Sequence, residues 1–125
     1  MNQKEVLTKV MNGWRNSVKC SKAPAERPKH RTVKFWLANW CWEHKLDFIT
    51  EVSFKSSQRA DFLIIKWGLI IEVLDSEKLT GSKKNYPFKT IKIQTTLQQY
   101  DITDMLEDLH TSNGKLADYY IKKYN

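Results

Sequence analysis

Cysteine and long apolar runs are both scarce in this chain. Its two cysteines, Cys20 and Cys41, are too few for a zinc site built mainly from thiolates or for a disulfide framework. No segment approaches the roughly 20 apolar residues that span a bilayer, and the first residues, MNQKEVLTKVMNGW, lack the apolar core of a signal peptide. We therefore expect a cytoplasmic protein in a reducing compartment, without a membrane partner.

Acidic residues are outnumbered by basic ones. The chain has 21 Lys and Arg against 14 Asp and Glu, so its formal net charge is +7. Such an excess attracts polyanions, and nucleic acid is the first candidate; an anionic membrane surface or solubility alone would give the same count. The length of 125 residues, 41% of them hydrophobic, leaves room for one domain and one core.

The hydrophobic pattern predicts an α/β fold. Apolar residues at intervals of four indicate a basic N-terminal helix, and a second amphipathic stripe extends from Pro28 to Lys45. Three runs rich in β-branched and aromatic residues follow: FITEVSF, RADFLIIKW and LIIEVL. Residues 89–95 alternate with the period of a half-buried strand, and the remainder of the chain has helical periodicity.

Two carboxylates stand inside the apolar runs. Glu72 lies in the middle of LIIEVL, and Asp61 precedes FLII. Burial of a carboxylate without a partner is costly, so a metal ion, a basic side chain such as Arg59, or exposure at a strand end must compensate Glu72. A short turn at Trp67 and Gly68 would bring both strands side by side. Paired carboxylates suit Mg²⁺, which prefers oxygen ligands and can activate water against a phosphate.

The run RADFLIIKWGLIIEVL, preceded by a helix and the strand FITEV, resembles the core signature of the PD-(D/E)xK, or restriction-endonuclease-like, nucleases. It is similar to that of archaeal Holliday-junction resolvases. In this signature an Asp opens one strand and Glu-x-Lys follows on the next. The resemblance covers approximately Pro28 to Ile93. It implies Asp61 and Glu72 as metal ligands, the backbone carbonyl of Val73 as a further ligand, and Mg²⁺ or Mn²⁺ as the cofactor.

The resemblance also implies an architecture. We expect a mixed four-stranded sheet of αβββ-(α)-β order, flanked by helices. The single nuclease-like domain, residues 1–125, would comprise a basic N-terminal helix (1–20), the core (28–95) and C-terminal helices (97–125). The segment of residues 75–90 is short and contains glycine where the family has a crossover helix. We therefore expect that helix to be reduced or missing.

Leu74 occupies the position of the motif lysine. A leucine cannot orient water or stabilise developing negative charge. Lys78, in the loop after the motif, is the preferred replacement. Lys66 is the other candidate, but five residues after Asp61 it falls on the opposite face of an ideal strand.

Other polar residues are candidates for the same site. Several members of the family contribute an acid from the helix before the first strand, which implies Glu26 or His30, four residues apart. Glu51 on the first core strand is a further candidate, with an ion pair to a neighbouring lysine as the alternative. Asp75 and Glu77 add negative charge beyond Glu72, although a solvated turn would explain them equally well.

These observations support three functional hypotheses. The first is a Mg²⁺-dependent endonuclease that hydrolyses phosphodiester bonds of DNA, including structured or branched DNA. The second, suggested by Leu74, is a catalytically inactive DNA-binding module that retains the nuclease fold. The third is an interaction protein whose basic surface engages an acidic protein partner. Many proteins of this fold act as dimers, so a homodimer is among the implied arrangements.

Overall fold

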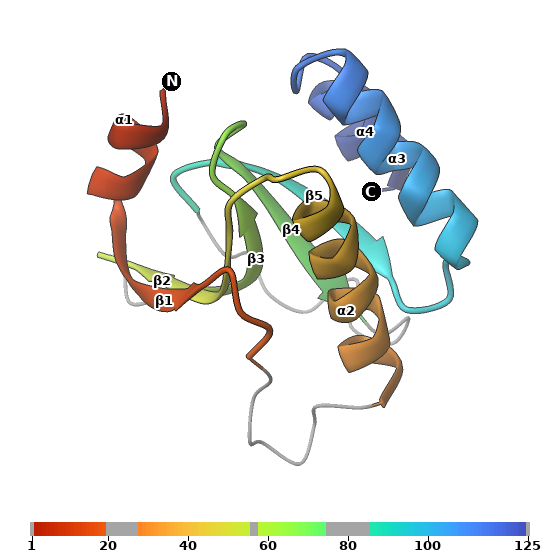
Figure 1. Ribbon diagram of the computed structural model, residues 1–125, viewed down its shortest axis with the longest axis horizontal. Coiled ribbons are helices and arrows are strands. Elements are labelled where there is room, and N and C mark those ends of the chain that lie inside the picture. Colours follow the sequence, from red (N-terminus) through yellow and green to blue (C-terminus); the bar gives the residue numbers. More distant parts are fainter. Residues whose placement is uncertain (1, 20–27, 56–57, 75–85, 125) are drawn as a thin grey trace.

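Four helices and one mixed sheet of five strands make up the described part of the chain (Figure 1). The computed structural model describes residues 2–19, 28–55, 58–74 and 86–124. The elements are α1 (Gln3–Thr8), β1 (Val10–Arg15), α2 (Pro28–Glu43), β2 (Phe48–Phe54), β3 (Arg59–Ile64), β4 (Leu69–Leu74), β5 (Lys89–Gln94), α3 (Gln99–Thr111) and α4 (Ala117–Tyr124). None of the helices in these ranges is long and apolar enough to cross a bilayer.

The strands follow one another across the sheet in the order β1-β2-β3-β4-β5. Strands β1 to β4 pair antiparallel, whereas β5 runs parallel to β4, with Glu72 opposite Lys92. The predicted α/β class and mixed sheet are therefore confirmed. The number of strands was wrong, because the sheet has five strands rather than four. A parallel pair needs a crossover connection; the predicted shortening of this crossover lies largely outside the described residues.

The extra strand comes from the segment that was predicted to be one long N-terminal helix. Only Gln3–Thr8 is helical, with the side chain of Asn2 accepting a hydrogen bond from the Glu5 amide. The chain then pairs with β2 as β1. A Cβ at Gly13 would lie 2.2 Å from Cγ2 of Ile49, so only glycine permits this close approach. The valines spaced by four suggested a helix, but pairing with β2 overrides that local pattern.

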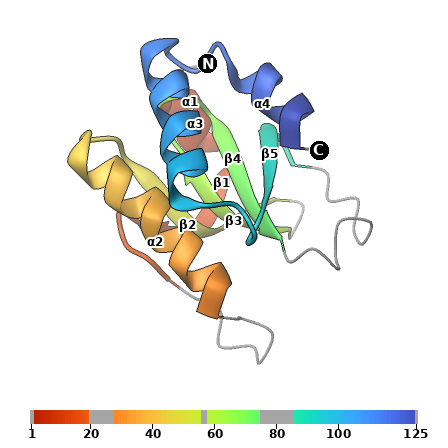
Figure 2. The same ribbon diagram turned by 90° about the vertical axis from the view of Figure 1, so that its right-hand side faces the viewer.

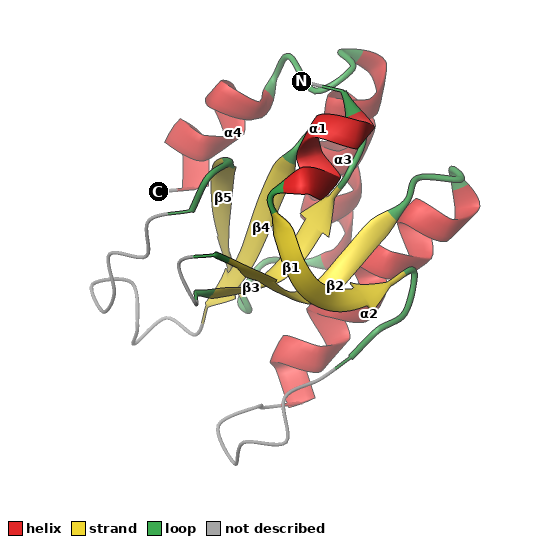
Figure 3. Cartoon of the chain, turned by 90° about the vertical axis from the view of Figure 1, so that its left-hand side faces the viewer, coloured by secondary structure: helices red, strands yellow, loops and turns green. Residues whose placement is uncertain are grey.

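Each face of the sheet carries its own apolar cluster. Helices α2, α3 and α4 cover the face that includes Phe62, Ile64 and Ile71 (Figure 2). Helix α1 lies on the other face, where Val6 joins a cluster with Leu63 (Figure 3). The alternation of side chains along β3 distributes its residues between the two faces.

Helix α2 carries a buried cysteine and both buried and exposed aromatic residues. Cys41 is completely buried, and burial raises the pKa of its thiol to about 12, as befits a small buried hydrophobe. Trp40 is also in the core and stacks on His44 with ring centroids 3.7 Å apart. Trp42 is 45% exposed, whereas Trp67, beyond the helix, packs against the core.

Candidate functional site

Strands β3 and β4 part at one end of the sheet. Their backbones pair regularly from Ile64↔Leu69 to Phe62↔Ile71. At the next position, where Asp61 and Glu72 would continue the pairing, side-chain hydrogen bonds replace the regular ladder. We call Asp61, Glu72 and Val73 the strand fork.

Each carboxylate of the strand fork accepts a hydrogen bond from the backbone of the opposite strand. The Asp61 amide donates to Oε1 of Glu72 at 2.8 Å. The Val73 amide donates to Oδ2 of Asp61, also at 2.8 Å. Hydrogen bonds from amides to a charged oxygen are among the stronger ones in proteins. Backbone amides are therefore part of what compensates these carboxylates, an explanation that the sequence pattern did not suggest.

Asp61 also meets a histidine from the helix above the sheet. Nε2 of His30, on α2, lies 3.5 Å from Oδ2 of Asp61, and both side chains are less than one-fifth exposed. Burial by itself would raise the pKa of Asp61. The hydrogen bond and charge of His30, the Val73 amide and the charge of Lys34 outweigh burial and hold this pKa below its ordinary value. Asp61 is therefore ionised at neutral pH.

A second set of charges lies beside the fork. Lys34 is fully buried, and its Nζ lies 3.6 Å from Oε1 of Glu51 and 3.1 Å from the carbonyl oxygen of Lys19. Nε of Arg59 lies 3.8 Å from the other Glu51 oxygen. Glu51 has a φ of +48°, in the left-handed region that residues other than glycine rarely adopt. Ion pairing of Glu51 with a lysine, the alternative to a metal-binding role, is present.

Tyr86 connects the two sets of charges. Its hydroxyl donates to the carbonyl oxygen of Arg59 at 3.0 Å. Burial raises the pKa of this hydroxyl well above its ordinary value, and the neighbouring carboxylates of Glu72, Asp61 and Glu51 raise it further. Three acidic residues from β2, β3 and β4 thus influence one phenol group. Tyr86 remains a neutral hydrogen-bond donor over the whole physiological pH range.

The structure brings together four of the predicted site residues. Asp61, Glu72 and Val73 form the fork, and His30 approaches it from α2. Glu26, Lys78, Asp75 and Glu77 lie outside the described residues.

Lys66 and Leu74, the two described residues that bear on the missing motif lysine, do not contribute to the fork. Lys66 is exposed in the turn that joins β3 to β4, at the closed end of the strand pair and away from the fork. Leu74 is partly buried and pairs with Gln94 of β5. Neither side chain has a described contact with the carboxylates.

Lys34 and Tyr86 were missed. The signal for Lys34 was present, since Leu37, Ala38 and Cys41 follow it at i+3, i+4 and i+7 and place it within an apolar helix face. A lysine within such a face needs a buried acceptor. Tyr86 carries no comparable local signal, because its neighbours in the site come from other strands.

The fork offers oxygen ligands suited to a hard divalent cation. Asp61 and Glu72 each have two carboxylate oxygens, and one oxygen of each accepts a backbone amide. Across the described ranges, however, no three or more Asp, Glu, His or Cys side chains are grouped to hold a metal ion. Mg²⁺ usually keeps several waters and uses one or two carboxylates together with substrate phosphate. Two carboxylates therefore meet the minimum for Mg²⁺ but do not form a dedicated cage.

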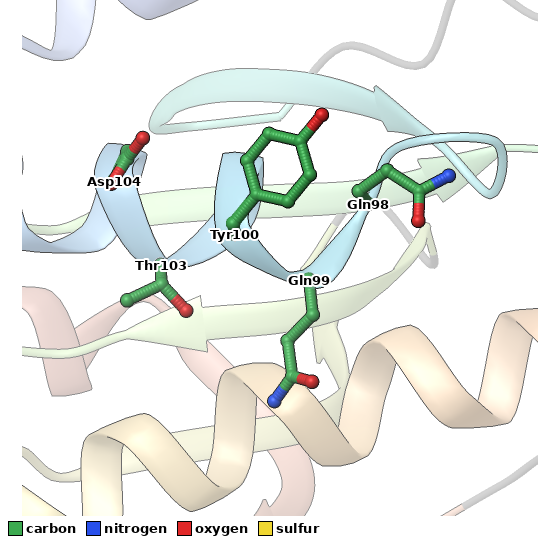
Figure 4. Close-up of a pocket in the computed structure, with 5 residues that line it drawn as sticks. All are labelled: Gln98, Gln99, Tyr100, Thr103 and Asp104. Carbon is green, nitrogen blue, oxygen red and sulfur yellow. The ribbon is translucent and has the colours of Figure 1, made fainter.

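Two surface depressions involve other residues. One, of about 440 Å³, lies at the start of α3 and is lined by Gln98, Gln99, Tyr100, Thr103 and Asp104 (Figure 4). The other, of about 320 Å³, lies between α2 and the segment that joins β5 to α3. Neither depression is lined by a carboxylate of the fork, so neither adds to that site.

Comparisons of the chain with protein-family models, with curated proteins and with solved structures found no match. The resemblance to the PD-(D/E)xK nucleases therefore rests on the residues of this chain and stays a prediction.

Proposed function

We propose that this protein is a metal-dependent DNA endonuclease whose reaction centre is the strand fork. The observation that supports this proposal most is the meeting of Asp61 and Glu72 on adjacent strands, with Asp61 ionised. Carboxylates at such a place attract a divalent cation rather than a phosphate. The net charge of +7 supplies the complementary attraction for a nucleic acid.

In this proposal the oxygen atoms of Asp61 and Glu72, together with the carbonyl oxygen of Val73, would hold Mg²⁺ or Mn²⁺. The bound ion would polarise the scissile phosphate and lower the pKa of the attacking water. His30 and the Val73 amide contact one oxygen of Asp61 and thereby orient the carboxylate. Lys34 adds positive charge near Asp61, and Lys78 remains the candidate for a basic group that contacts the phosphate.

The proposal is tested by DNA cleavage in the presence of Mg²⁺ or Mn²⁺. Supercoiled, single-stranded and junction substrates cover the expected range. Asp61→Asn and Glu72→Gln keep one oxygen acceptor for the backbone amides while weakening the metal site. We expect each to lower cleavage by more than about 100-fold, because even outer partners of metal ligands are worth about 10- to 100-fold.

The matched control is Asp104→Asn, which alters an exposed acid on α3. It is expected to cleave as the unaltered protein does. Equal cleavage by the unaltered protein and by Asp61→Asn would contradict the proposal.

A second function has specific support. The fork carboxylates already accept backbone amides, and Leu74 replaces the motif lysine, as expected for a DNA-binding module without catalysis. This alternative predicts binding without cleavage, insensitive to chelators and falling steeply as salt is raised. Calorimetric titration with Mn²⁺ separates the two functions, since only the nuclease requires an ion bound through Asp61 and Glu72.

A further inference from the structure

Exposed aromatic side chains occur on β1 and on α2, and a basic residue accompanies them on each side. Three aromatic residues are about half exposed: Trp14 on β1 at 52%, and Phe35 and Trp42 on α2 at 47% and 45%. Isolated exposed aromatic residues need no explanation, but a group of them marks an interaction site. We call this set, together with Lys19 and Arg31, the aromatic strip.

The segment of residues 16–19 joins the two parts of the strip, leading from β1 toward α2 (Figure 1). Nε1 of Trp42 donates to the carbonyl oxygen of Asn16 at 3.2 Å. The hydroxyl of Thr50, on β2, donates to the Ser17 carbonyl at 2.6 Å and accepts from the Lys19 amide at 2.9 Å. These contacts fasten the segment to both the sheet and the helix, so the strip is built on a fixed support.

The indole ring of Trp14 already carries a positive charge over one face. Nζ of Lys19 lies 4.7 Å from the ring centroid, within the range of a cation–π contact. A flat, half-exposed ring beside a lysine suits a nucleotide, because the base can stack on the ring while the ammonium group meets a phosphate.

The α2 part of the strip has the same composition. Arg31 and Phe35 are four residues apart and are both exposed, so they are neighbours on the helix surface. Trp42, seven residues after Phe35, lies on nearly the same side of the helix. Helix α2 thus carries a second exposed aromatic ring with a cation next to it on the helix surface.

The strip is physically linked to the fork. Arg31 follows His30, whose ring contacts Asp61. Lys34 contacts the Lys19 carbonyl on one side and Glu51 on the other. A strand held on the strip would therefore run close to the carboxylates.

We propose that the aromatic strip binds unpaired nucleotides of a nucleic acid strand, with bases stacked on Trp14 and Phe35 and phosphates near Lys19 and Arg31. This inference rests on the proposed function in one respect, since it names the substrate class as nucleic acid with a single-stranded stretch beside the fork. Paired bases cannot stack on these rings without leaving the duplex.

Another aromatic and basic group, on α4, offers a matched control. Tyr119 is 55% exposed, and Nζ of Lys123 lies 5.8 Å from its ring centroid. This ring is adjacent in sequence to Asp118, whose carboxylate pairs with Lys89. Tyr119→Ala therefore removes an exposed aromatic ring near a lysine without touching the aromatic strip.

The test measures binding of labelled single strands of about 12 nucleotides, as DNA and as RNA, and of the matching duplex, by fluorescence anisotropy in EDTA. We expect Trp14→Ala and Phe35→Ala each to weaken single-strand binding about 5- to 150-fold, which corresponds to one lost base stack. Trp14→Phe keeps a stacking ring and should retain most of the affinity, and Tyr119→Ala should retain all of it. Phe35 lies on α2, so the Phe35→Ala variant tests the strip even if Trp14→Ala disturbs β1.

Unchanged single-strand binding by both Trp14→Ala and Phe35→Ala would overturn the inference. An equal loss of single-strand and duplex binding would also overturn the inference, because it would indicate a general effect of charge or folding. A difference between DNA and RNA in the unaltered protein supports the inference and identifies the strand that the strip takes. Failure to bind either strand would overturn it and favour a protein partner for the exposed rings.

Failure of the inference can be told apart from failure of the proposed function. Binding in EDTA involves no divalent ion, so it reports on the strip separately from cleavage. If the strip variants lose binding but nothing cleaves, the strip stands and the nuclease proposal fails. If cleavage depends on Asp61 while the strip variants bind and cleave normally, the nuclease proposal stands and the inference fails.

Discussion

Strands β3 and β4 are organised differently at their two ends. Near the connecting turn, Phe62, Leu63 and Ile64 pair with β4 through the backbone and are fully buried. At the fork, Asp61 and Glu72 use their carboxylates to bind the backbone amides of the opposite strand. A sheet can therefore open locally without leaving these amides unpaired, provided that acidic side chains supply the missing acceptors.

The contacts of helix α2 also differ along its length. Its C-terminal half contributes Leu37, Trp40 and Cys41 to the core. Its N-terminal half presents His30 to Asp61 and Lys34 to Glu51. The N-terminal half also buries Val33 in the core, so this end of the helix is held by apolar packing and by charge together.

The largest effect is expected in the closed part of the strand pair. Phe62 is fully buried and stacks on Phe48 with ring centroids 4.9 Å apart. Phe62→Ala should lower the free energy of unfolding by about 3–5 kcal/mol through lost burial and the cavity it leaves. Urea denaturation followed by tryptophan fluorescence measures this loss. A loss smaller than that caused by the fork variants would contradict the expectation that the closed part contributes more to stability.

The next effect concerns the acceptors at the fork. Glu72→Ala leaves the Asp61 amide without its acceptor and should lower the free energy of unfolding by about 1–3 kcal/mol. Glu72→Gln keeps an oxygen at that place and should recover most of the loss. Hydrogen exchange provides the local measurement: the Asp61 amide should exchange faster in Glu72→Ala, while the Leu63 amide in the closed part should follow global stability. Equal stability of the two variants would show that the acceptor oxygen is unimportant.

The pH dependence of the unfolding free energy reports on the contribution of Asp61 at the fork. The pKa of Asp61 is lower in the folded than in the unfolded protein, so the folded state binds fewer protons near pH 4. The contribution of Asp61 is complete above its unfolded pKa and is lost as the pH falls through its folded pKa. Asp61→Asn should therefore show a flatter dependence of unfolding free energy on pH between about 5 and 2. The Val73 amide proton shift should titrate with Asp61 in the unaltered protein; parallel pH profiles of the two proteins would contradict this account.

The smallest effect is expected at an exposed ion pair that belongs to neither end. Nη2 of Arg15 lies 3.1 Å from Oδ2 of Asp47, but the two side chains are 50% and 41% exposed. Arg15→Gln should change the free energy of unfolding by about 0.2–1 kcal/mol, and less at high salt. Denaturation at low and high ionic strength provides the measurement. A loss comparable to that of Glu72→Ala would show that the exposed ion pair contributes as much to stability as the part-buried hydrogen bond at the fork.

Most helices and strands of the described chain were predictable from the sequence. The apolar stripe over Pro28–Lys45 became α2, and the runs around Asp61 and Glu72 became adjacent antiparallel strands. The sequence also named His30, with Glu26, as a candidate from the helix, and the structure places His30 beside Asp61. The N-terminal segment was the clear failure, because its valines at intervals of four fit a helix while Gly13 and pairing with β2 favour a strand.

The positions of the two carboxylates within apolar runs can be read from the sequence, since the contrast between an acid and its apolar neighbours is contained in a few consecutive residues. The groups that compensate their charge depend on how the chain packs. The Asp61 amide and the Glu72 carboxylate are 11 residues apart, and Lys34 reaches Glu51 from another element. Such partners meet only when helices and strands pack, so local patterns predict that a buried charge needs a partner but not which atom provides it.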